Sequence, residues 1–186
     1  MPIEAVDPVV GTSAGAVVGA QLGSGVGLGL LFQAQLEPPE PAEQRPVELD
    51  WDAMGALWLE LGQQATGPED FRARMGARAL AAAAVPESEG IERIVSRLPM
   101  AGWPARALLV TAVDVATGEL AVFDRDAGVP LTLAVAASCA VPMVWQPVTI
   151  DGRRYMDGGT RSPTNADLAA DRVLALWGTG PDTPST

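Results

Sequence analysis

The 186 residues are enough for one domain with a sizeable core, and 48% hydrophobic residues with an ordinary charge content favour a globular chain over a disordered one. The net charge of -11, with no cluster of basic residues, opposes contact with phosphate backbones and anionic bilayers, so we expect no nucleic acid partner. All twelve basic residues are arginines and there is no histidine, which excludes a histidine base, a lysine nucleophile and any histidine-containing metal site.

The chain begins with a predicted strand and helix. Residues 7–10 are typical of a short strand that ends at Gly11, and the small and aliphatic residues from Ala14 to about Leu31 predict a helix. Glycines recur every fourth residue from Gly15 to Gly27, which puts them on one face and favours close approach to a neighbour. The same spacing fits a membrane helix, an alternative that the polar residues within the run disfavour.

The other elements follow from hydrophobic periodicity and turn residues. The proline- and acid-rich stretch 37–48 predicts an exposed loop, and 179–186 a disordered tail after one domain spanning 1–178. Strands separated by helices indicate an α/β fold. The expected elements are helices over 50–64, 69–84, 88–97 and 131–139, a hairpin of 107–113 with 119–123, a hairpin of 148–150 with 153–155, and a strand over 172–177.

The turn between the first strand and helix carries a G-x-S-x-G pattern, GTSAG, centred on Ser13. This spacing presents a serine on a tight strand-to-helix turn, with Gly11 and Gly15 as its small neighbours. The backbone N–H of Ala14, at the helix N-terminus, is placed to stabilise an oxyanion. The alternative is a glycine-rich turn whose serine only caps the helix.

A nucleophilic serine needs a proton acceptor, and the composition leaves carboxylates, Tyr155, Cys139 and the terminal amine. Asp157 stands out because it follows a predicted strand and precedes Gly158 and Gly159, which permit a sharp turn. As a base it would need burial to raise its pKa from near 4. The alternative is an ordinary Asp-Gly-Gly turn. The hairpin-end acids are expected to be solvated: Asp114, Asp124, Asp126 and Asp151.

The single cysteine, Cys139, lies in the apolar run AVAASCAVP and is expected to be a buried structural thiol. It cannot form an internal disulfide, and the first residues lack a secretory pattern, so we expect a cytoplasmic protein. The sequence has neither a Walker loop nor the G-x-G-x-x-G register, so nucleotide binding has no support. We expect no cofactor and no metal.

Three stretches together resemble the patatin-like phospholipase family: VVGTSAGAVVGAQL, LAVAASCAVPMVWQPVTIDGRRYMDGG and SPTNADLA. The resemblance implies a three-layer α/β/α sandwich and a lipid acyl hydrolase with a serine-aspartate dyad. Ser13 would then be the nucleophile and Asp157 the general base. The implied partner is a lipid or small ester substrate, with transient contact to a membrane surface.

The chain departs from the family pattern at its start. Family members carry a glycine-rich oxyanion loop on an earlier strand, whereas only twelve residues precede Ser13 and the first glycine is Gly11. We therefore expect the first strand and the oxyanion loop to be absent, as in a chain truncated at its N-terminus. The alternative function is a catalytically impaired fragment that acts at most as a lipid-binding module.

Overall fold

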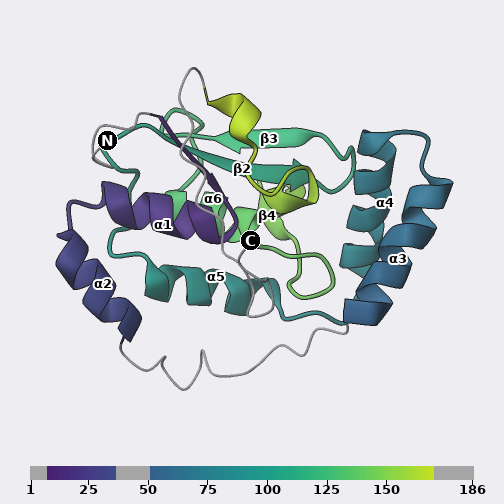
Figure 1. Cartoon of the computed structure of the whole chain (residues 1–186), viewed down its shortest axis with the longest axis horizontal. Helices are drawn as coiled ribbons and strands as arrows, with labels where there is room; N and C mark the ends of the chain where they lie inside the picture. The colour runs from purple at the N-terminus through teal and green to yellow at the C-terminus, as the bar shows by residue number, and fades with distance from the viewer. Residues whose placement is uncertain (1–7, 37–50, 170–186) are drawn as a thin grey trace, which may run out of the picture.

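A computed structural model describes residues 8–36 and 51–169 of the chain (Figure 1). Within these ranges the chain forms a mixed sheet with helices packed against it. The predicted loop over 37–48, the predicted strand over 172–177 and the predicted tail over 179–186 lie outside the described residues.

The strands pair as one five-stranded sheet in which β2 is central. β1 pairs with β2 in parallel, whereas β3 and β5 pair with it antiparallel and β4 completes the sheet beyond β5. Both predicted hairpins are therefore confirmed. The strands are β1 (Val9–Thr12), β2 (Leu108–Asp114), β3 (Leu120–Phe123), β4 (Val148–Ile150) and β5 (Arg153–Asp157).

The helices lie close to the predicted positions, with one exception. The predicted bounds of the last four are within three residues of those observed. Two short 3-10 turns follow the last strand, Gly158–Thr160 and Ala166–Leu168. The helices are α1 (Ala14–Gly23), α2 (Leu28–Leu36), α3 (Trp51–Gln64), α4 (Pro68–Ala81), α5 (Glu87–Arg97) and α6 (Leu131–Ser138).

The single helix predicted from Ala14 to about Leu31 is wrong, because the chain leaves the helix after Gly23. The amide of Ser24 donates to the carbonyl of Gln21 at 3.1 Å, and Gly25 adopts a φ of 83°, a conformation that glycine enters without steric cost. α2 then starts at Leu28 as a separate helix. Among the described residues, every helix is too short or too polar to cross a bilayer.

The sheet has a different hydrophobic cluster on each face. In Figure 1, α1, α5 and α6 lie beneath the sheet and the α3–α4 pair lies at its far end. Alternate residues of β2, such as Val110 and Ala112, pack with α1, α5 and α6. Val113 faces the other way and packs with Met75 of α4 and Met156 of β5. This arrangement confirms an α/β sandwich.

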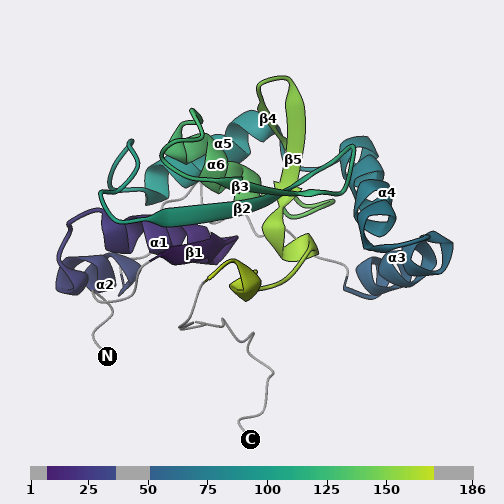
Figure 2. The same cartoon turned by 90° about the horizontal axis from the view of Figure 1, so that it is seen from above.

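β1 and β5 share the same edge of β2. At residues 110–111, β2 has β1 on one edge and β3 on the other, and at residues 112–113 it has β5 on one edge and β3 on the other. β1 and β5 therefore both lie on the edge of β2 opposite β3. β1 runs parallel to β2 and β5 runs antiparallel to it, so their carboxyl ends meet midway along β2, as Figure 2 shows. The residues that follow these two strand ends are therefore brought together.

Candidate active site

The turn at Ser13 has an uncommon backbone conformation. Ser13 adopts φ 53° and ψ -125°, which a non-glycine residue enters only at a cost of about 1–3 kcal/mol. Its amide donates to the hydroxyl oxygen of Ser138 at 2.9 Å, a contact that holds this geometry. Gly11 permits the turn, because a Cβ there would lie 2.6 Å from the Cα of Ala16. The sequence therefore forms a strand-turn-helix elbow with a specific glycine requirement.

The Ser13 side chain does not serve as a helix cap. It makes no capping hydrogen bond to the first turn of α1, although its carbonyl accepts from the amide of Ala16 at 2.8 Å. Ala14 and Gly15 are exposed in that first turn, which contains no acidic residue. The interpretation of Ser13 as a cap is therefore wrong. The exposed helix N-terminus favours an anionic group beside Ser13.

Asp157 ends β5 and is only 4% exposed. One carboxylate oxygen, Oδ1, accepts the amide of Gly159 at 2.6 Å, as in the predicted Asp-Gly-Gly turn. The other oxygen, Oδ2, is buried and has no hydrogen bond partner among the described residues. Asp157 therefore shapes the turn with one oxygen and keeps the other available for a second role.

Burial is the main influence on the charge of Asp157. It raises the pKa of the carboxyl from 3.8 to about 6, against the opposing effects of the Ser13 hydroxyl and the Gly159 amide. The Ser13 side chain is thus close enough to Asp157 to stabilise its charged form. A carboxylate with this pKa still carries its charge at neutral pH and is a better base than a solvated one.

The two glycines after Asp157 are required by close packing. A Cβ at Gly158 would lie 2.6 Å from the carbonyl oxygen of Thr111, and one at Gly159 would lie 2.9 Å from Oδ1 of Asp157. Neither position tolerates a side chain without movement of its neighbours. In contrast, a Cβ at Gly15 would meet nothing within 4 Å, so that residue is not required for packing.

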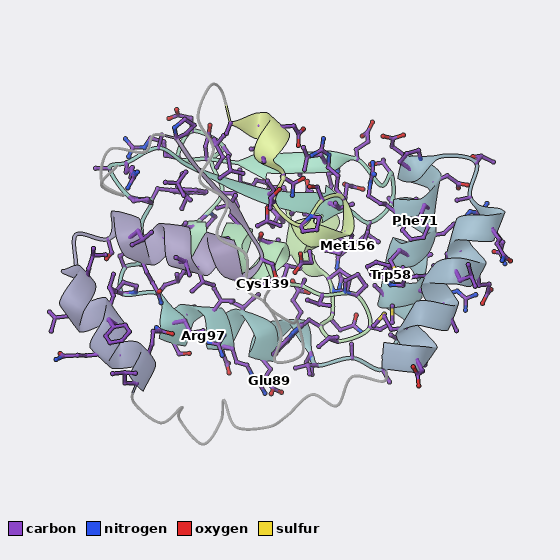
Figure 3. All side chains as sticks on the ribbon, in the orientation of Figure 1. Trp58, Phe71, Glu89, Arg97, Cys139 and Met156 are labelled. Carbon is purple, nitrogen blue, oxygen red and sulfur yellow. The ribbon has the colours of Figure 1, made fainter. Side chains whose placement is uncertain are left out.

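Cys139 lies beside the same site. Figure 3 labels it next to the first turn of α1, and its thiol interacts with the Ser13 hydroxyl. The residue as a whole is half-buried, but burial around the sulfur and the nearby charge of Asp157 raise the pKa of the thiol. The thiolate form is therefore strongly disfavoured at neutral pH. Cys139 contributes to the walls of the site as a neutral group.

Comparison with known families decides the assignment. The sequence profile described as patatin-like phospholipase matches residues 2–170. The chain belongs to the patatin-like phospholipase family. A search of curated proteins found no match. As a family, patatin-like phospholipases are lipid acyl hydrolases, and the family assignment confirms the resemblance noted in the sequence.

The patatin-like chain positions both Ser13 and Asp157 through one short segment at the C-terminal end of α6. Ser138 accepts the amide of Ser13, and the carbonyl of Ala140, two residues later, accepts the amide of Asp157 at 2.9 Å. Sequence reasoning assigned no role to Ser138. The feature that could have identified Ser138 is that it is a polar residue within the apolar run AVAASCAVP, and in the structure Ser138 is fully buried.

A second set of contacts that sequence reasoning missed lies on the other face of the sheet. The hydroxyls of Thr12 and Thr111 are 2.8 Å apart, and the side-chain amide of Asn165 contacts both, at 3.1 Å and 3.3 Å. All three residues are buried. Buried polar groups are costly unless they are hydrogen bonded, so this cluster is a specific feature of the site.

The prediction that Asp114 is solvated is wrong. Asp114 is 3% exposed, and its Oδ1 accepts the amides of Ala116 and Thr117 at 2.9 Å and 3.0 Å. Its other oxygen pairs with Arg153 at 2.9 Å. Asp114 therefore stabilises the hairpin turn between β2 and β3 and is not available as a base. Asp126 and Asp151 are exposed, as expected.

Proposed function

We propose that the chain hydrolyses lipid-type carboxylic esters, with Ser13 as nucleophile and Asp157 as general base. The observation that carries this proposal is the buried Asp157 carboxyl beside the Ser13 hydroxyl, with an Oδ2 that has no hydrogen bond partner among the described residues. An unpaired buried carboxylate oxygen costs the folded state free energy, and a catalytic role explains why the chain keeps one here. The absence of histidine from the sequence leaves this carboxylate as the base within reach of Ser13.

In the first half-reaction the Ser13 hydroxyl oxygen attacks the ester carbonyl carbon while its proton moves to Asp157. The carbonyl oxygen gains the negative charge, and the N–H of Ala14, the exposed first residue of α1 directly after Ser13, donates a hydrogen bond to it. The bond to the alcohol then breaks, and the alcohol leaves with the proton from Asp157. The product is an acyl-serine.

In the second half-reaction water attacks the acyl-serine carbonyl. Asp157 accepts a proton from the water, and the same helix N-terminus stabilises the oxyanion. The bond to the Ser13 oxygen breaks, the serine regains its proton and the carboxylic acid is released. The chemistry requires no cofactor.

The test is hydrolysis of a short-chain nitrophenyl ester combined with labelling by a fluorophosphonate probe. We expect hydrolysis by the unmodified chain, loss of both readouts in Ser13→Ala, and loss of hydrolysis in Asp157→Asn. Asp151→Asn, which changes an exposed turn carboxylate, is the matched control and should retain activity. Hydrolysis retained in both Ser13→Ala and Asp157→Asn would overturn the proposal.

Lipid binding without turnover is the second candidate function, and α2 favours it. This helix has no buried residue and exposes Leu28, Leu30, Phe32 and Leu36 by 50% or more. Residues 8–36 contain no charged side chain, although the whole chain carries -11. A helix of this kind favours apolar contact with an uncharged lipid surface.

The two candidates differ in one readout. Lipid binding without probe labelling of Ser13 would favour the binding module, whereas turnover would favour the enzyme. We also propose a cytoplasmic location, since the single cysteine offers no internal disulfide.

A further inference from the structure

Asn165 is the one asparagine in the sequence, and it is completely buried. It adopts a left-handed conformation, with φ 46° and ψ 37°, just before the second 3-10 turn. Asparagine tolerates this conformation better than most residues, but a buried amide there still needs all its hydrogen bonds. The residue therefore combines a strained backbone with a buried polar side chain.

The orientation of the Asn165 amide follows from its neighbours. Its Oδ1 faces Arg161, which only donates, at 2.8 Å. Its Nδ2 faces the carbonyl oxygens of Ser162 and Gly158, which only accept, at 2.8 Å and 3.2 Å. The nitrogen must therefore point into the protein, where it also meets Thr12 and Thr111.

These contacts join the two halves of the site. Thr12 directly precedes Ser13, and Gly158 directly follows Asp157. β1 and β5 each pair with β2 but not with one another among the described strands. Asn165 bridges this break, since one nitrogen atom contacts the end of β1 and the residue after β5.

We propose that Asn165 is a positioning residue that fixes the separation of Ser13 and Asp157. It contacts neither reacting group and acts through Thr12 and Gly158. The inference rests on the proposed function for its catalytic consequence. We call the contacts of Asn165 with Thr12 and Gly158 the clamp. The clamp does not depend on turnover, because it sets the relative position of the ends of β1 and β5.

The clamp is supported from the surface by an ion pair. Arg161 donates to Asn165 and also forms two hydrogen bonds with Asp167, at 2.9 Å and 2.7 Å. This pairing directs the guanidinium towards Oδ1 of Asn165. The amide therefore has partners on both sides, which disfavours its rotation.

The test compares Asn165→Asp with Met75→Ala. Asn165→Asp keeps the side-chain shape but removes the two N–H donors. Met75→Ala is the stability control, because Met75 of α4 is buried in the hydrophobic cluster with Val113 and Met156, a cluster that does not include Asn165. Hydrogen exchange of the Ser13 and Gly159 amides gives the direct readout, since each donates one of the hydrogen bonds described above.

We expect Asn165→Asp to speed exchange at both amides and to lower kcat by about 10- to 100-fold, with KM changed much less. Met75→Ala should lose stability yet keep kcat below its unfolding temperature. Thr12→Val, which removes one acceptor while keeping the branched shape, should show the same pattern more weakly and serves if Asn165→Asp does not fold.

Unchanged exchange at both amides in a folded Asn165→Asp would overturn the inference, as would a loss of kcat no greater than in Met75→Ala. Failure of the proposed function would look different. The unmodified chain would then lack hydrolysis and labelling, while Asn165→Asp would still alter exchange at the two amides.

Discussion

Thr12 and Asp157 occupy consecutive register positions on β2, opposite Thr111 and Ala112 respectively. The two strands approach this point from opposite ends, so the residue after Thr12 meets Asp157. The register of two separate ladders thus brings Ser13 and Asp157 together. A slip of one residue in either ladder would also turn the affected side chains to the other face of the sheet.

The first prediction concerns the pH dependence of hydrolysis. Asp157 must be deprotonated to accept the serine proton, and burial raises its pKa to about 6. We expect kcat/KM to rise with pH, with an apparent pKa near that value, and to level off above it. Initial rates on a neutral ester between pH 4 and pH 8 measure this. A profile centred near pH 4 would indicate a solvated carboxylate instead.

The second prediction concerns stability. Because the folded-state pKa of Asp157 is raised, the protonated carboxyl favours folding, and this contribution is lost as pH rises from 3.8 through about 6. Asp157→Asn removes the buried charge and should stabilise the fold at pH 7 by on the order of 1–3 kcal/mol. Urea unfolding at pH 7 and pH 4 measures the difference.

At pH 4 the stabilisation by Asp157→Asn should nearly vanish. The carboxyl of the unmodified folded protein is then largely neutral, like the amide that replaces it in the variant. Asp151→Asn, at an exposed turn, is the control. A destabilised Asp157→Asn at pH 7 would mean that the charge has a favourable partner. The expected result is a variant with higher stability and no activity, as occurs when function maintains an unfavourable charge.

The third prediction concerns Ser138. Its replacement by alanine leaves the amide of Ser13 without an acceptor, which costs about 1–3 kcal/mol for a buried group. We expect a lower unfolding temperature and a lower kcat, since Ser13 would lose its fixed backbone conformation. The control is Ser24→Ala, which removes a hydroxyl that accepts the amide of Val26 at 3.1 Å, at the far end of α1. Equal losses of kcat in both variants would contradict the prediction.

The fourth prediction concerns α2 and lipid surfaces. Leu30 and Phe32 are each 65% exposed, as is Leu59 on α3. The double change Leu30→Glu and Phe32→Glu should weaken binding to phosphatidylcholine vesicles by roughly tenfold or more, because two large apolar groups can no longer enter the lipid. Leu59→Glu should bind like the unmodified chain. Co-sedimentation with vesicles measures the binding. An equal loss of binding in the double variant and in Leu59→Glu would show that α2 has no specific part in the interaction.

Local sequence patterns were sufficient for most elements and for the elbow. The G-x-S-x-G spacing, the aliphatic residues before it and the small residues after it specify a strand-turn-helix unit without reference to distant residues. The hairpins followed from their glycine turns, where Gly118 and Gly152 have φ of 71° and 77°. The break after Gly23 was missed because a continuous apolar run hides a helix end.

The supporting contacts could not be predicted in the same way. Ser138 lies 125 residues from Ser13, and Asn165 lies 153 residues from Thr12, so no local spacing connects them. Asp114 was misjudged because a carboxylate in a hairpin turn is usually solvated. Here one oxygen of Asp114 accepts two backbone amides of the turn. These contacts depend on which strands become neighbours, which periodicity does not encode.

The shared edge of β2 also bears on how the chain folds. β1 pairs with a strand that lies about a hundred residues later in the sequence, since the paired residues Thr12 and Thr111 are 99 apart. Pairing between such distant segments is slow to form. Ser13 and Asp157 therefore remain apart in any folding intermediate that lacks either ladder. Under the proposed function, recovery of ester hydrolysis during refolding would therefore report the time at which both ladders have formed.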